Sequence, residues 1–128
     1  MIGYATLGSN DLDKALPFYD ALFAVVGGKR LMQMPDERQL TFYGNAPKTP
    51  MVAIGKPYDG GTATAGNGTM ISLAMETREQ VDALYAKAVE LGGADEGAPG
   101  PRGPEAMGFY GGYFRDLDGN KFCAFKMG

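Results

Sequence analysis

The order of predicted elements in this chain occurs twice, and this repeat constrains the fold more than any other feature. The first copy begins with a short apolar run at Ile2–Leu7, which predicts a strand. Ser9-Asn10-Asp11 supplies capping residues, and apolar side chains then recur at helical spacing over Leu12–Val26. Gly27-Gly28 marks the end of this helix. The unit is therefore a strand followed by a capped helix.

The second copy has the same parts in the same order. Gly68–Met75 predicts a strand, and Thr77 with Gln80 forms a capping-box pattern. Val81–Leu91 then has the spacing of a helix with one buried face, and Gly92-Gly93 ends it. The glycine pairs of the two copies lie 65 residues apart in the sequence. An internal duplication is the simplest explanation of this pattern.

Strand signals follow each helix, and no further helix is indicated. They fall at Lys29–Met34, Gln39–Tyr43 and Met51–Ile54 in the first half, and at Ala94–Pro104, Gly108–Arg115 and Lys121–Lys126 in the second. Each half therefore reads βαβββ, which predicts an α+β fold of two tandem modules in one domain over residues 1–128. Module 1 spans about residues 1–56, a connector about 57–67, and module 2 about 68–128.

Pro17 lies within the otherwise regular helical pattern of the first half. A proline in a helix interior removes a backbone hydrogen bond and its ring clashes with the preceding turn. We therefore expect either a kink at Pro17 or a first turn that is not α-helical.

The chain contains no histidine. Catalysis by Ser-His-Asp or Cys-His groups is therefore excluded, as is any metal site that requires imidazole. Cys123 is the only cysteine, so no internal disulfide can form. A lone thiol fits a reducing compartment, and we expect a cytoplasmic location.

The charge and hydrophobicity of the chain argue against two classes of partner. Twelve basic and fifteen acidic residues give a net charge of −3, with no basic block, so we expect no nucleic-acid partner. No apolar run approaches membrane-spanning length, and the N-terminus lacks the pattern of a signal peptide. We therefore expect no membrane partner.

Two stretches carry a family resemblance. NDLDKALPFYDAL at residues 10–22 and YFRDLDGNKF at residues 113–122, set within two βαβββ halves, resemble the vicinal oxygen chelate family. This family includes glyoxalases, bleomycin-resistance proteins and extradiol dioxygenases. The resemblance covers nearly the whole chain and implies that the modules form a curved mixed sheet around a cleft. It also implies a homodimer, with the cleft within one chain or shared by two.

The family's metal ligands project into the cleft from the first and last strands of the halves. Carried over by position, the corresponding residues here are Tyr4, Met70 and Cys123, where the family commonly has two His and one Glu. A phenol, a thioether and a single thiol make a poor set of ligands for a divalent metal. We therefore expect neither a metal nor another cofactor at this site.

Alternation along the strands predicts which side chains face the cleft. Tyr4 and Thr6 share one face of the first strand, and Met70 and Ser72 share one face of the strand that opens module 2. Cys123 faces the cleft only if no β-bulge occurs near Asp118-Gly119, because a bulge would reverse its direction.

Further aromatic and charged residues are candidates for the cleft wall. We predict that Phe42, Tyr110 and Phe114 point inward if the last two strands pair regularly. Arg102 lies in a Gly/Pro-rich loop that could close over a ligand. The alternative for the aromatic residues is ordinary core packing, and for Arg102 a solvated loop position.

Three hypotheses of function follow. The first is a metal-free protein that binds a small, partly apolar organic molecule, as the bleomycin-resistance branch of the family does. The second is a metal-free lyase or isomerase that uses Tyr4 or Cys123 as acid or base. The third is a metal-dependent lyase of the glyoxalase type with ligands drawn from Glu and Gln.

Overall fold

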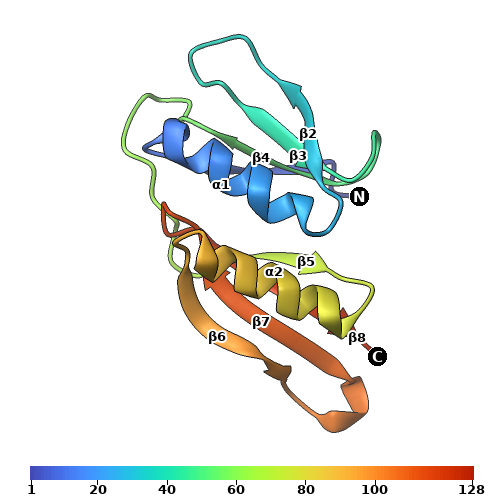
Figure 1. Ribbon diagram of the computed structural model, residues 1–128. Coiled ribbons are helices and arrows are strands. Elements are labelled where there is room, and N and C mark those ends of the chain that lie inside the picture. Colours follow the sequence, from blue (N-terminus) through green and yellow to red (C-terminus); the bar gives the residue numbers. More distant parts are fainter.

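The computed structural model describes residues 1–128 and contains the two predicted βαβββ modules (Figure 1). Module 1 comprises β1 (Tyr4–Gly8), α1 (Leu12–Ala24), β2 (Lys29–Gln33), β3 (Thr41–Gly44) and β4 (Met51–Gly55). Module 2 comprises β5 (Ile71–Ala74), α2 (Arg78–Glu90), β6 (Ala94–Pro101), the short 3₁₀ helix η1 (Glu105–Met107), β7 (Phe109–Arg115) and β8 (Lys121–Met127). The predicted α+β class and the internal repeat are confirmed.

Each module contributes one four-stranded mixed sheet. Sheet A has the order β1-β4-β3-β2 and sheet B the order β5-β8-β7-β6. In both sheets the first strand pairs in parallel with the last strand of its module, and the remaining pairs are antiparallel. The parallel pairing requires a crossover connection, and the helix of each module supplies it.

The helix starts are capped as the sequence predicts. Asp11 caps α1 by accepting from the backbone N–H of Lys14, and Thr77 caps α2 by accepting from that of Gln80. The Gln80 side chain accepts in turn from the backbone N–H of Glu76, at 2.8 Å. The α-helix α1 runs continuously through Pro17, so the alternative that its first turn is not α-helical is wrong.

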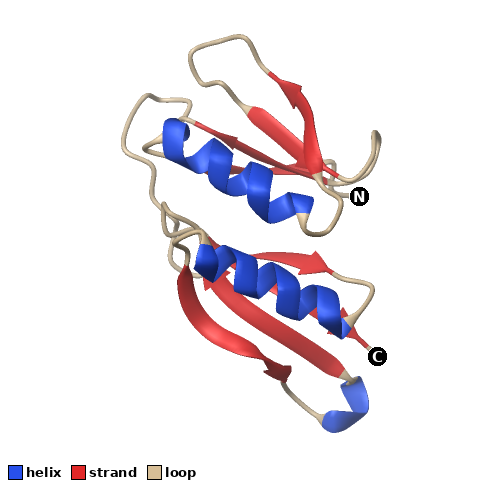
Figure 2. Ribbon diagram, viewed as in Figure 1, coloured by secondary structure: helices blue, strands red, loops and turns tan.

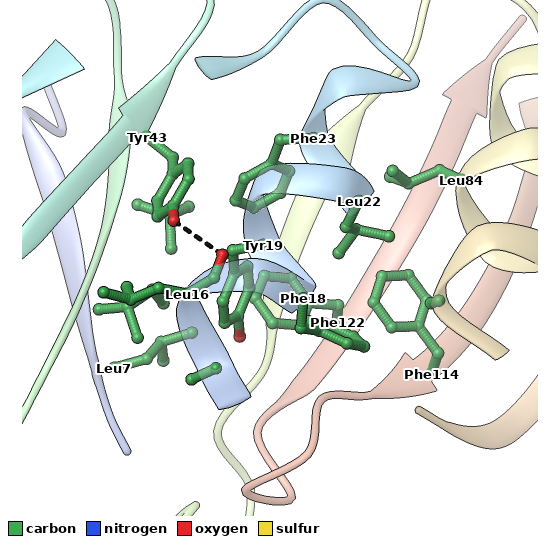
Figure 3. Close-up of a cluster of buried hydrophobic side chains, with 14 of the residues drawn as sticks. Leu7, Leu16, Phe18, Tyr19, Leu22, Phe23, Tyr43, Leu84, Phe114 and Phe122 are labelled. Carbon is green, nitrogen blue, oxygen red and sulfur yellow. Dashed lines mark hydrogen bonds between the residues drawn. The ribbon is translucent and has the colours of Figure 1, made fainter. Parts of the chain in front are cut away.

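The helix-covered faces of both sheets share one hydrophobic core. The two helices lie side by side (Figure 2). Figure 3 shows Tyr19 of α1 between Tyr43 of sheet A and Phe122 of sheet B, with ring centroids 5.9 and 6.1 Å from the Tyr19 ring. Leu84 of α2 belongs to the same cluster. One face of each sheet therefore belongs to this core, and we call the other face its open face.

A buried carboxylate connects the two modules at the turn between β7 and β8. The hydroxyl of Tyr19 in module 1 donates to Asp116, which also accepts from the backbone and side-chain amides of Asn120. Asn120 donates in addition to the carbonyl of Gly8, at 3.0 Å. Gly119 adopts a positive φ of 87°, which this turn requires and glycine allows. The aspartate turn therefore joins β8 to β7 and also holds module 1 in place.

Two predicted cleft residues lie on the wrong face. Phe114 is fully buried in the core, where its ring stacks on Phe122 at 5.5 Å. Tyr110 lies on the same helix-covered face, where its hydroxyl donates to Asp82 of α2 at 2.6 Å. The strands β7 and β8 pair regularly, as the prediction assumed. However, the residues of β7 that alternate with Tyr110 and Phe114, and not these two, lie on the open face of sheet B. The prediction that Tyr110 and Phe114 point inward is therefore wrong.

Neither helix has the length and apolar character that crossing a membrane requires.

Candidate functional site

The open face of sheet A carries a row of mostly apolar side chains. Strand register places Thr6 beside Ala53, Ala53 beside Phe42, and Phe42 beside Met32. Tyr4 contacts the ring of Phe42 edge-on, with a centroid distance of 5.0 Å and an interplanar angle of 77°. Phe42 and Ala53 are buried in a small cluster that is separate from the main core.

Two large side chains at this face stay exposed. Tyr4 is 53% exposed and Met32 is 49% exposed. Met51 lies beside Tyr4 in the β1–β4 register and packs against the small cluster. The structure thus places Tyr4, Thr6 and Phe42 on one face, as alternation predicts. Met32 and Met51 were not predicted from the sequence; for Met32, the bulge in β2 between Arg30 and Met32 breaks the alternation from which its face would be predicted.

The open face of sheet B is centred on Cys123. Strand register places Ser72 on one side of Cys123 and Tyr113 on the other. The β7–β8 pairing shows no register shift, so no bulge reverses the direction of Cys123. Its neighbours Phe122 and Ala124 point into the main core, which leaves Cys123 for the open face.

Burial suppresses the reactivity of this thiol. Cys123 is only 1% exposed. Burial raises the pKa of Cys123 above its ordinary value, although Tyr113 and the cations Arg102 and Lys121 act in the opposite direction. Burial, followed by the nearby Cys123, also raises the pKa of Tyr113. At neutral pH both groups are therefore protonated, and Cys123 is a weak nucleophile.

Two basic side chains lie near the ring of Tyr113, and a third, Arg115, follows it two residues later on β7. The guanidinium of Arg102 lies 5.8 Å from the centroid of the Tyr113 ring, and Nζ of Lys121 lies 5.7 Å from it. Arg115 is engaged by an ion pair with Glu96. The predicted candidate Arg102 therefore lies at this face, and its guanidinium donates to the carbonyl of Ala98 at 2.7 Å.

The residues carried over from the family's metal site do not fit a divalent metal. Tyr4 lies on sheet A, whereas Cys123 lies on sheet B and Met70 lies just before β5. Their donor atoms are a neutral phenol, a protonated thiol and a thioether, which are poor ligands for the metals that prefer oxygen or nitrogen. No group of three Cys, Asp or Glu side chains is placed to hold a metal ion within this chain.

Two hollows border the sheets, the first at the open face of sheet B and the second on the helix-covered side of sheet A. One of about 540 Å³ is lined by the Gly/Thr-rich connector over residues 65–69, by Met70, and by Arg115 and Lys121 of sheet B. The other, of about 470 Å³, lies where β5 meets module 1 and is mostly apolar. Ser72 is the one predicted site residue that lines the second hollow.

The structure brings the predicted residues together in two groups. Tyr4, Thr6 and Phe42 share the open face of sheet A. Ser72, Cys123 and Arg102 lie at the open face of sheet B, with Met70 at its edge; no hydrogen bond, ion pair or aromatic contact links the two groups.

Tyr113 and Lys121 are the residues of this face that sequence reasoning missed. A signal for Tyr113 was present: Arg115 and Lys121 flank the turn, and counting back from them places Tyr113 opposite Cys123. Lys121 follows from the same count, because it shares a strand face with Cys123.

Comparison with known proteins agrees with the architecture. A model of the Glyoxalase/Bleomycin resistance protein/Dioxygenase superfamily matches residues 1–124. A search of the curated proteins found no match. Among solved structures, the chain is similar to a glyoxalase/bleomycin resistance protein from Albidiferax ferrireducens, with 35% identity, 98% of each chain covered and a TM-score of 0.83.

Two further structures show the same fold. A hypothetical protein from S. aureus is 30% identical, with 98% of this chain and 92% of that chain covered and a TM-score of 0.73. Glyoxalase I from Zea mays is 24% identical, with 97% of this chain and 43% of that chain covered and a TM-score of 0.69, a likeness that concerns the fold alone. The chain belongs to the glyoxalase/bleomycin resistance protein/dioxygenase superfamily.

Proposed function

We propose that the protein binds a small, partly apolar organic molecule on the open faces of its two sheets, and that no metal ion takes part. The observation that carries this proposal is the open face of sheet A. Its Tyr4 and Met32 side chains are about half exposed although they adjoin a buried apolar cluster. Such a surface loses water favourably when an apolar ligand covers it.

We also propose that the binding site is completed by a homodimer. The two sheets are hydrogen-bonded separately, and their helix-covered faces share one core. The open faces therefore lie on the outside of one chain, each without an opposing wall. A second copy that sets its sheet A opposite sheet B of the first would enclose a cleft with an apolar wall and a polar wall.

The chemistry of the side chains favours binding over catalysis. A general acid or base needs a pKa near the working pH, and burial moves the pKa of Cys123 and Tyr113 upward and away from neutrality. The lyase or isomerase hypothesis therefore has no supporting group on sheet B. A cytoplasmic location stays a prediction.

Titration with the neutral apolar dye N-phenyl-1-naphthylamine tests the binding proposal. The dye should fluoresce on binding, and Tyr4→Ala and Met32→Ala should weaken its binding. The matched control is Val89→Ala, since Val89 is 40% exposed on α2, outside both open faces. Absence of dye binding, or equal effects of the Tyr4 and Val89 variants, would contradict the proposal.

Two further measurements test the dimer and the metal. Sedimentation equilibrium should give twice the 13.6 kDa mass of one chain. Elemental analysis after dialysis against zinc, nickel, iron and manganese should find close to no metal per chain. A monomer would remove the shared cleft, and stoichiometric metal would revive the metal-dependent lyase hypothesis.

A further inference from the structure

Two basic side chains at the open face of sheet B have no acidic partner. The three ion pairs of the structure involve Arg30, Lys87 and Arg115, and neither Arg102 nor Lys121 takes part in one. Both are half-buried. Partial burial removes part of the hydration of a cation, and an anionic partner offsets this cost.

The two cations differ in how they are held. Arg102 donates to the carbonyls of Ala98 and Pro101, at 2.7 and 3.1 Å, so its guanidinium is fixed in place with N–H groups to spare. Lys121 makes no hydrogen bond through its ammonium group, which lies near the Tyr113 ring and lines the hollow of about 540 Å³. This hollow gives a ligand access to Lys121.

The charge of this face is opposite to that of the chain. Arg102, Arg115 and Lys121 lie at this face, and the carboxylate of Glu96 is paired with Arg115. Arg115 lowers the pKa of Glu96 most and Lys121 lowers it less, whereas burial and the neighbouring Asp95 raise it. The face thus carries a local excess of positive charge, whereas the whole chain has a net charge of −3. Such a local reversal attracts anions to one place on the surface.

We propose that Arg102 and Lys121, whose charged groups lie 5.8 and 5.7 Å from the centroid of the Tyr113 ring, form a subsite for an anionic group of the ligand, such as a carboxylate or a phosphate. This inference rests on the proposed binding function and adds the chemical class of the ligand: an apolar body for sheet A and an anionic group for sheet B. Guanidinium and ammonium groups donate charge-assisted hydrogen bonds to both kinds of oxyanion.

Two dyes that share an anilinonaphthalene body test the subsite. The first, 8-anilino-1-naphthalenesulfonate, carries one sulfonate, and N-phenyl-1-naphthylamine carries no charge. Wild-type protein should bind the sulfonate dye more tightly, and added salt should reduce this preference. Arg102→Gln with Lys121→Gln should weaken the sulfonate dye about tenfold and leave the neutral dye unchanged.

The matched control removes the same charge elsewhere. Lys14→Gln with Lys87→Gln changes two lysines on the helices and should alter neither dye. Either single change, Arg102→Gln or Lys121→Gln, serves as the test if the double variant does not fold. Displacement of the sulfonate dye by benzoate or by phenyl phosphate then tells whether the subsite prefers a carboxylate or a phosphate.

The outcomes separate the two proposals. Equal affinity for both dyes, or a preference for the sulfonate that survives the double substitution, would overturn the anion subsite and leave the binding function standing. Failure of both dyes to bind would overturn both. A salt-sensitive preference that disappears in the double variant supports the subsite.

Discussion

Replacing Tyr19 by Phe tests whether the buried Asp116 cluster holds the two modules together. The change removes one hydroxyl, which donates to Asp116 across the module boundary, and leaves the ring in the core. Hydrogen bonds to charged groups contribute about 1.5–3 kcal/mol to stability. With about 2.1 cal/mol/K of unfolding entropy per residue, the 128-residue chain loses roughly 3–4 °C of Tm per kcal/mol. Tyr19→Phe should therefore lower Tm by about 5–11 °C.

Thermal unfolding followed by far-UV circular dichroism measures the Tm, since the chain has no tryptophan, and urea unfolding measures the corresponding free energy. Tyr58→Phe is the control, because it removes an exposed hydroxyl and should change stability by less than about 0.5 kcal/mol. A double-mutant cycle with Asp116→Asn should give a coupling energy above about 1 kcal/mol. Equal stability of the Tyr19 and Tyr58 variants, or additivity in the cycle, would refute the role given to this cluster.

Three further predictions concern pH, packing and thiol chemistry. Burial raises the pKa of Tyr19 and of Tyr43, so these phenols lose their protons at a lower pH in the unfolded chain than in the folded one. Stability should therefore be full below about pH 10 and fall above it. Urea midpoints should show a steeper fall in wild type than in Tyr43→Phe. Phe114→Ala should cost about 3–5 kcal/mol in urea unfolding and leave the affinity for N-phenyl-1-naphthylamine unchanged, whereas a lining residue would show the reverse. Cys123 should react with Ellman's reagent far more slowly in the native protein than in urea, because it is buried and protonated; equal rates would contradict this.

The architecture could be predicted because local signals agreed with each other. The capping residues Asp11 and Thr77 act as predicted, and the strands of both halves fall close to the expected ranges. Each module is a strand, a helix and three strands, so its hydrophobic periodicity changes only twice. The repeat then supplied a second, independent reading of the same unit, which a single module would not offer.

The facing of β7 could not be predicted from composition. Its sequence alternates aromatic and small residues in pairs, so Phe109, Tyr110, Tyr113 and Phe114 allow either face to be the apolar one. Pairing with β8 decides the matter, because the register that sets Tyr113 opposite Cys123 turns Phe114 toward the core. The aromatic residues of β7 indicated that this strand forms part of a cleft wall, but only the cross-strand register shows which of them do so.

The positions of unpaired charges also depend on tertiary structure. Arg115 and Lys121 flank the same turn, yet Glu96 of β6 forms an ion pair with Arg115 and none with Lys121. Glu96 lies 19 residues before Arg115, and the bulges of β6 shift its register, so the choice between the two cations is not visible along the chain. Sequence reasoning could therefore identify Arg102 as a basic loop residue but could not identify Lys121 as the second unpaired cation.

The side chains at the carried-over metal positions change what the open face of sheet B can do. A divalent ion attracts anionic oxygens and also activates a bound water or polarises a substrate. Arg102 and Lys121 attract an anion through N–H donors but offer no coordination position for activation. Positive charge stands beside Met70, whose thioether has no ionisable proton, and beside Cys123, whose thiol is protonated at neutral pH. Such a face can hold and orient an anionic ligand without altering it. A binding protein requires no more than this, whereas a lyase would also need a group that activates its substrate.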